Sequence, residues 1–144
     1  MKEYITNSVE ETIAAAEEVA ASLCAGDIIL YEGDMGAGKT HFTKGIAKCL
    51  GIDDEITSPT FALVNEYYGK LPFFHFDLYR IESYDDLYAI GFFDYLDRGG
   101  IIAAEWSENI SELTYELRDA IKIRIEKLSD TERRIIVSGK YFGR

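Results

Sequence analysis

The residues best suited to chemistry form a glycine-rich run that ends in a lysine and a threonine. The run matches the phosphate-binding pattern G-x-x-x-x-G-K-[ST] at every fixed position. Its glycines let backbone N–H groups turn inward around a polyphosphate, because no Cβ stands in the way. In this pattern the lysine binds the β- and γ-phosphates and the threonine hydroxyl is a ligand of Mg²⁺. The residues expected to contact a nucleotide are Gly33, Asp34, Met35, Gly36, Ala37, Gly38, Lys39, Thr40 and His41.

Two carboxylates end apolar runs further along the chain. Asp77 follows residues 73–76 and Glu105 follows residues 101–104. In α/β sheets ligands collect at the carboxyl ends of strands, so both acids lie beside the loop if their strands run parallel to the strand before it. Hydrolysis needs a carboxylate near Mg²⁺ and a group that orients the attacking water. A structural strand-end carboxylate, or a helix cap, is the alternative for each acid.

Other polar residues near these motifs have a functional and a structural interpretation. Thr60, in the segment Ser58-Pro59-Thr60, is either part of a plain turn or a switch residue that reaches the γ-phosphate side of Mg²⁺. Trp106 is either a core residue or a contact for a partner. We interpret both His41 and His75 as packing residues, although His41 lies where an imidazole could touch the α-phosphate.

Two absences from the sequence bear on which nucleotide is bound and on how fast it is hydrolysed. The guanine motif [NT]-K-x-D does not occur, which favours ATP over GTP; the D-x-x-G match at Asp97 lacks a preceding apolar strand and is interpreted as chance. We expect no arginine finger next to the loop, with Arg80 as the one candidate within the chain. Such a finger, supplied by a partner, accelerates hydrolysis by about 10³–10⁵ in other P-loop proteins, so turnover by the chain alone should be slow.

Composition bounds the class of protein. The 144 residues, 47% hydrophobic, predict one domain over residues 1–144. No run approaches the ~18 apolar residues of a membrane span, and the first residues do not resemble a signal peptide. Cys24 and Cys49 are too few and too far apart for a disulfide or metal framework, which favours the cytoplasm.

The net charge of −11 argues against direct binding of nucleic acid, since such binding requires several phosphates to be neutralised together. Basic residues do gather near the C-terminus, but acids alternate with them. A solvated hairpin face is therefore the favoured interpretation of residues 121–137.

Hydrophobic periodicity predicts the elements that position these groups. Strands are expected at 1–6, 27–31, 62–68, 73–78 and 101–104, and a terminal hairpin at 121–126 and 135–137. Helices are expected from Ser8 to a stop at Gly26, at 41–50, from Ser83 to Gly91 and at 109–117, with a short helix or loop at 92–100. This order indicates an α/β fold with a partly parallel sheet and antiparallel additions.

Together the motifs resemble one family, the TsaE (YjeE) ATPases of bacterial tRNA threonylcarbamoyladenosine (t6A) biosynthesis. The resemblance covers nearly the whole chain. Its most specific part is the block His-Phe-Asp-Leu-Tyr-Arg. The matching segments are Gly33–Thr40, Ser58–Phe61, Glu66-Tyr67, His75–Arg80 and Glu105-Trp106.

The resemblance implies a P-loop NTPase-like three-layer domain, a parallel sheet flanked by antiparallel strands. It also implies slow hydrolysis of ATP with Mg²⁺. The expected partner is a TsaB–TsaD heterodimer, which itself binds tRNA and transfers the threonylcarbamoyl group and which the ATP cycle is expected to reset.

The resemblance also assigns roles to single residues. Thr40 and Glu105 are expected to bind the metal, Asp77, Glu105 and Thr60 to act in catalysis, and Lys39 to bind the phosphates.

Some features depart from the family or lie outside its motifs. His41 stands where the family often has a second threonine, which puts only a hydroxyl contact to the α-phosphate in doubt. The adenine pocket has no sharp motif, and residues 6–9 and the hairpin near Arg133 are its expected positions. A small-molecule kinase and a nucleotide-dependent binding module are the other functions considered; a kinase needs an arginine-bearing lid, and the seven arginines form no such cluster.

Overall fold

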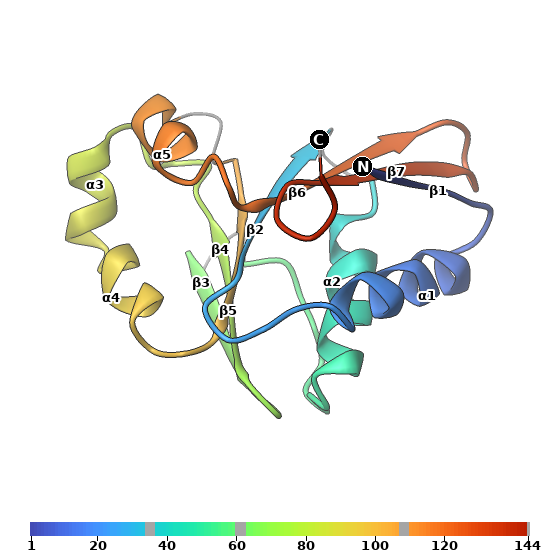
Figure 1. Cartoon of the computed structure of the whole chain (residues 1–144), viewed down its shortest axis with the longest axis horizontal. Coiled ribbons are helices and arrows are strands. Elements are labelled where there is room, and N and C mark those ends of the chain that lie inside the picture. Colours follow the sequence, from blue (N-terminus) through green and yellow to red (C-terminus); the bar gives the residue numbers. More distant parts are fainter. Residues whose placement is uncertain (34–36, 60–62, 107–109, 144) are drawn as a thin grey trace.

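A central parallel sheet with antiparallel edges organises the chain (Figure 1). The computed structural model describes residues 1–33, 37–59, 63–106 and 110–143. In these ranges a seven-stranded sheet has the order β1-β7-β6-β2-β5-β4-β3. β6, β2, β5 and β4 are parallel, β3 is antiparallel to β4, and β7 and β1 extend the other side antiparallel. The strands are β1 (Lys2–Thr6), β2 (Ile28–Gly33), β3 (Val64–Tyr68), β4 (Pro72–Asp77), β5 (Ile101–Glu105), β6 (Ile121–Lys127) and β7 (Arg133–Ser138).

Helices cover both faces of the sheet, which confirms the three-layer α/β class (Figure 1). On one face lie α1 (Val9–Ala20) and α2 (Lys39–Cys49). On the other lie the short helices α3 (Tyr84–Ala89), α4 (Phe92–Leu96) and α5 (Ser111–Glu116). Side chains alternate between the two faces, as the period of two in a strand requires. In β2, for example, Ile29 and Tyr31 join the core beneath α1 and α2, whereas Leu30 joins the core beneath the short helices.

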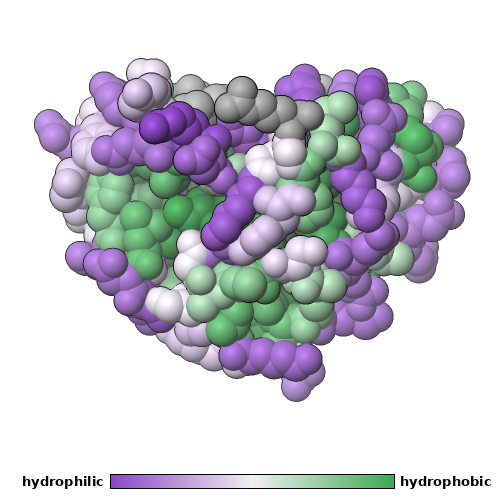
Figure 2. Space-filling view, viewed as in Figure 1, coloured by the Kyte–Doolittle hydropathy of each residue, from purple (hydrophilic) through white to green (hydrophobic). Residues whose placement is uncertain are grey.

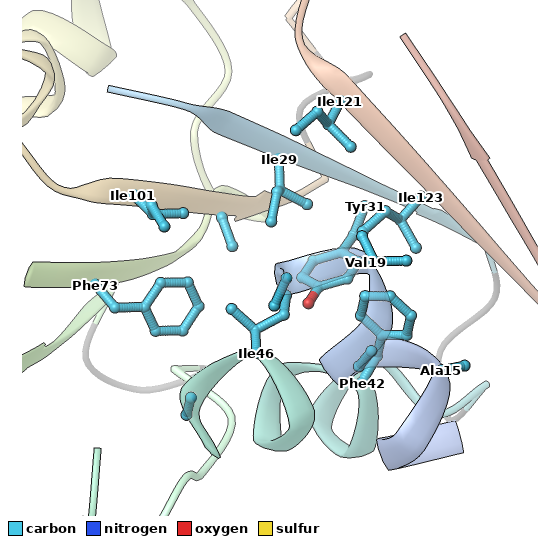
Figure 3. Close-up of a cluster of buried hydrophobic side chains, with 14 of the residues drawn as sticks. Ala15, Val19, Ile29, Tyr31, Phe42, Ile46, Phe73, Ile101, Ile121 and Ile123 are labelled. Carbon is cyan, nitrogen blue, oxygen red and sulfur yellow. The ribbon is translucent and has the colours of Figure 1, made fainter. Parts of the chain in front are cut away.

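Figure 3 shows the core on the side of α1 and α2, which holds more of the described buried residues than the core on the other side. Ile121 and Ile123, on alternate positions of β6, point into it, as do Phe42 and Ile46 of α2. The helix predicted at 41–50 therefore packs its apolar side chains on the sheet.

The core on the opposite side has thinner cover. Its helices are six, five and six residues long. Such short helices leave hydrophobic side chains only partly buried, and Ile90, Phe93 and Leu96 are among them. Figure 2 shows hydrophobic residues at the surface on this side of the molecule, bordered by hydrophilic ones.

The first helix begins as predicted but ends early. The Ser8 side chain accepts a hydrogen bond from the Glu11 N–H, while the Glu11 carboxylate accepts from Asn7 N–H. α1 ends at Ala20, not near Gly26, because the N–H groups of Ser22 and Leu23 bond to carbonyls three residues back. Such bonds tighten the last turn and end the α-helical ladder.

The terminal hairpin presents a charged face, as expected. Arg134 pairs with Glu3 at 3.1 Å, and Arg124 lies 3.9 Å from Glu32. These basic side chains therefore lie close to acidic ones and do not form a basic surface. Among the helices of the described ranges, none is long and apolar enough to cross a membrane.

Gly45 lets α1 and α2 pack closely. A Cβ built at this position would lie 2.4 Å from the Ala16 Cβ and 2.4 Å from the Ile13 carbonyl oxygen. The backbone of α2 thus approaches α1 at a distance that no other residue permits.

We predict that Gly45→Ala destabilises the protein, although alanine is the better helix former by about 1 kcal/mol. The added methyl group overpacks the contact between α1 and α2, and overpacking lowers the free energy of unfolding by about 1–3 kcal/mol. Urea unfolding measures the change. Lys48→Ala on the exposed side of α2 is the control and should stay within about 0.5 kcal/mol of wild type; an equal or higher stability of Gly45→Ala would contradict the packing argument.

Candidate functional site

The ends of three parallel strands meet at one edge of the sheet. Tyr31 of β2 pairs with Glu105 of β5, and Glu105 pairs in turn with Asp77 of β4. The glycine-rich loop leaves β2 two residues after Tyr31. The predicted placement of both acids at the carboxyl ends of strands parallel to β2 is therefore confirmed.

Backbone geometry at both ends of the loop requires glycine. Gly33 has φ 120°, and a Cβ there would lie 2.2 Å from the Ile125 carbonyl oxygen of β6. Gly38 is the N-cap of α2 with no side-chain capping bond. The first N–H groups of α2 therefore have no side-chain acceptor at the cap, and a helix N-terminus of this kind favours an anion.

A cavity of about 230 Å³ lies over this helix start. Its volume is below the ~300–1,000 Å³ of pockets that enclose a whole ligand, so it matches the phosphate end of a nucleotide better than all of it. It brings together most described residues of the predicted site. The lining residues are Gly38, Lys39, Thr40, His41, Ser58, Glu105, Trp106 and Arg133.

Lys39 is buried and its ammonium lies against an aromatic ring. Its Nζ is 5.2 Å from the centroid of the Trp106 ring. Trp106 itself has φ 66°, a conformation that is strained for a residue with a side chain and that clusters at functional sites. Among the ion pairs of the described ranges, none involves Lys39, so no carboxylate there neutralises its charge.

A buried pair of hydroxyl groups fixes the first turn of α2. The Thr43 Oγ1 donates to the Lys39 carbonyl at 2.8 Å and lies 2.7 Å from the Tyr31 hydroxyl, which therefore donates to Thr43. Burial raises the pKa of Tyr31, opposed by the bond to Thr43 and reinforced by Glu105. The phenol therefore keeps its proton and its role as donor.

Arg133 lies beside the loop, but its guanidinium is bound to backbone carbonyls, so the expectation that the chain supplies no arginine finger there stays a prediction. The Arg133 Nε donates to the Ala37 carbonyl at 2.9 Å, and its Nη1 donates to the Ser129 and Glu132 carbonyls at 2.8 and 3.0 Å. Arg80, the expected candidate, is exposed. Because 96 residues separate Arg133 from Ala37, no local sequence signal could have revealed this contact.

His41 lines the cavity as a neutral imidazole. Burial lowers its pKa, and the nearby charges of Lys44 and Arg133 lower it further. Its Nδ1 is buried, with no hydrogen-bond partner among the described residues. A neutral imidazole beside Lys44 and Arg133 adds no further positive charge at the cavity.

Asp77 stands apart from the cavity residues, and four other predicted residues lie outside the described ranges. Asp77 is not among the described residues that line the cavity, and its Oδ1 accepts a bond from the Tyr79 N–H at 3.0 Å. A strand-end carboxylate that accepts such a bond can have a purely structural role in the turn. The catalytic role of Asp77 therefore stays a prediction. Asp34, Met35, Gly36 and Thr60 lie outside the described residues.

The donors in the cavity suit Mg²⁺ held together with phosphates. Within the described ranges, no group of three or more His, Cys, Asp or Glu side chains could hold a metal ion alone. Mg²⁺ is usually bound by one or two protein ligands plus substrate phosphates and water, not by an all-protein cage. The Thr40 hydroxyl and the Glu105 carboxylate, which line one cavity, fit this donor set.

Comparison with known proteins identifies similar chains. The profile of the family described as "Threonylcarbamoyl adenosine biosynthesis protein TsaE" matches residues 6–135. The tRNA threonylcarbamoyladenosine biosynthesis protein TsaE of Bacillus subtilis is 42% identical over 90% of this chain and 80% of its own. That of Treponema pallidum is 36% identical over 93% and 98%. The crystal structure of Bacillus subtilis YdiB superposes with TM-score 0.74 at 36% identity, covering 93% of this chain and 82% of that one.

We predict that the His41 ring titrates by NMR with a midpoint below the usual 6.5, because burial and two neighbouring cations disfavour its charged form. Arg133→Gln and Lys44→Gln should each raise the midpoint, since each removes a like charge. The chain has two histidines, so His41→Gln assigns the signals. A midpoint at or above 6.5, or no response to either substitution, would contradict this electrostatic environment.

Proposed function

The chain belongs to the TsaE family of threonylcarbamoyl adenosine biosynthesis proteins, and from this membership we propose that it is the Mg²⁺-dependent ATPase subunit of the tRNA t6A machinery. The observation that carries the proposal is the convergence of Lys39, Thr40 and Glu105 on one cavity at the start of α2. A lysine, a hydroxyl and a carboxylate around a helix N-terminus are the groups that a metal–triphosphate needs.

Each residue then has a distinct task. The loop N–H groups and Lys39 bind the phosphates, and Arg133 fixes the loop through the Ala37 carbonyl. Thr40 and Glu105 hold Mg²⁺, which when bound neutralises charge that develops on the phosphate oxygens. We assign Asp77 and Thr60 to the water and switch side. His41 contributes a neutral donor near the phosphates.

Turnover by the chain alone should be slow. The guanidinium of Arg133 donates hydrogen bonds to backbone carbonyls of the loop and of the β6–β7 turn. These bonds occupy its N–H groups at Nε and Nη1, so it is not free to bind the transferred phosphate. A partner would therefore supply the charge that accelerates hydrolysis. We propose that this partner is a TsaB–TsaD heterodimer in the cytoplasm, which transfers the threonylcarbamoyl group and which the ATP cycle resets.

The chain should reach tRNA only through that complex. Its net charge is −11, and the basic side chains of the terminal hairpin pair with acids. A surface of this kind gains little from the release of counterions by phosphates, which is the main source of nonspecific affinity for nucleic acid. It is better suited to a protein surface of complementary charge.

We predict that Lys39→Ala weakens binding of Mg·ATP by about 10- to 150-fold. The substitution removes a charge-assisted contact worth about 1.5–3 kcal/mol. Isothermal titration calorimetry measures the affinity, and Lys48→Ala, which removes an exposed charge of the same sign on α2, is the control. Equal affinities of wild type and Lys39→Ala, or a clear preference for GTP, would contradict the proposed function.

Substitution of Glu105 should change the Mg²⁺ requirement, whereas substitution of Asp77 should change the rate of hydrolysis. We predict that Glu105→Gln raises the Mg²⁺ concentration required for ATP binding, because a metal ligand supports the metal–nucleotide complex. Asp77→Asn should lower kcat at saturating Mg·ATP, because a water-orienting acid supports the chemical step. Steady-state hydrolysis at several Mg²⁺ concentrations separates the two. The opposite pattern would exchange the assignments, and normal kinetics of Asp77→Asn would leave that residue with its structural role.

A further inference from the structure

A fully buried histidine lies beneath the proposed metal side of the cavity. His75 is at the centre of β4 and its side chain is 0% exposed. It pairs with Ala103 of β5, two residues before Glu105, so both side chains project from the same face of the sheet. The imidazole and the carboxylate are therefore diagonal neighbours on adjacent parallel strands.

The two side chains touch. His75 Nε2 lies 2.7 Å from Glu105 Oε2. Two lone pairs at this distance would repel, so one of the two atoms carries a hydrogen, which we place on Nε2. The N–H direction is not in line with the oxygen, so the contact has ion-pair length without the alignment of a straight hydrogen bond. Catalytic hydrogen bonds are often poorly aligned before ligand binds and tighten in the complex.

Packing alone does not explain a histidine here. The ring lies between Tyr31 and Phe73, with centroids 6.0 and 6.4 Å away. Its Nδ1 is buried and has no hydrogen-bond partner among the described residues. Burying an unpaired nitrogen is unfavourable, and a phenylalanine would fill a space among aromatic rings without that penalty. The contact with Glu105 is the feature that only a residue with a polar ring edge provides.

The strand neighbours of Glu105 are poorly placed to hold it. Tyr31, directly opposite on β2, donates its hydroxyl proton to Thr43. Asp77, directly opposite on β4, carries a charge of the same sign. A glutamate side chain has several rotatable bonds, so one fixed oxygen strongly restricts the directions in which the other can point.

We propose that His75 is a positioning residue that holds Oε2 of Glu105 through its Nε2–H and thereby directs the carboxylate into the cavity. The inference rests on the proposed function, because it is the metal role of Glu105 that gives the orientation its value. Groups that orient a metal ligand in this way typically change metal affinity by about 10- to 100-fold when they are lost.

Two variants separate positioning from packing. His75→Gln keeps an N–H donor on a flexible chain, and His75→Met is apolar and of similar length. We expect His75→Met to raise the Mg²⁺ concentration for half-maximal ATP binding by about 10-fold or more, and His75→Gln to recover most of that loss. ATP binding without Mg²⁺ should be the same in all three proteins, measured by calorimetry at temperatures where each is folded.

A second measurement needs no ligand and no variant of His75. In the ligand-free protein, Glu105→Gln should shift the ¹⁵N resonance of His75 Nε2, because it replaces the charged oxygen that this nitrogen contacts. Glu55→Gln, on an exposed segment before the cavity, is the control and should leave the resonance unchanged.

Three results would overturn the proposal. The first is a His75 resonance that does not shift in Glu105→Gln, and the second is an Mg²⁺ requirement of His75→Met equal to that of wild type. The third is an equal loss in His75→Gln and His75→Met, which would assign the residue to packing. Failure of the proposed function would give a different result, namely no binding of Mg·ATP by the wild-type protein. In that case the NMR measurement still tests whether His75 contacts Glu105, because it needs no ligand.

Discussion

The parallel register of β2, β5 and β4 is the constraint on which the candidate site depends. Because Tyr31 pairs with Glu105 and Glu105 with Asp77, one row across the sheet carries the strand that starts the loop and both acids. A slip of one residue in β5 would turn Glu105 to the opposite face, beneath the short helices. Ile101 and Ala103 pack in one core and Ile102 and Ala104 in the other, so the polar Glu105 is the residue of β5 for which the two faces differ.

Polar side chains within the larger core connect this register to the cavity. Tyr31 reaches α2 through Thr43 and fixes the carbonyl of Lys39, while His75 reaches the carboxylate of Glu105. Both rings lie on the face covered by α1 and α2, and their centroids are 6.0 Å apart. Functional groups held by rigid elements keep their geometry better than groups on loops. The close packing of the two helices at Gly45 therefore contributes indirectly to the site, because it stabilises the helix whose first turn lines the cavity.

Local patterns in the sequence were sufficient to predict most of the helices and strands. Alternating Ile121, Ile123 and Ile125 identified a half-buried strand, and the fixed glycines, lysine and threonine predict a phosphate site where the structure has a cavity. Acids after apolar runs marked the edge of the sheet where ligands bind. What could not be predicted depends on spatial neighbours. Arg133 of β7 reaches Ala37 because only β6 separates β7 from β2, and His75 reaches Glu105 because β4 lies beside β5. Local sequence patterns do not determine this strand order. The early end of α1 depends on hydrogen bonds to carbonyls three residues back, which the helical pattern between Ser8 and Gly26 does not reveal.

In the proposed function, this chain hydrolyses ATP to reset a t6A-forming complex between turnovers. A reconstituted reaction with a TsaB–TsaD heterodimer, tRNA and a threonylcarbamoyl donor tests it most directly, through the number of modified tRNA molecules per complex. With this chain and Mg·ATP, the account predicts that product accumulates well beyond one per complex, and that Lys39→Ala leaves the reaction near a single turnover. Equal product with and without the chain, or full activity of Lys39→Ala, would contradict the account.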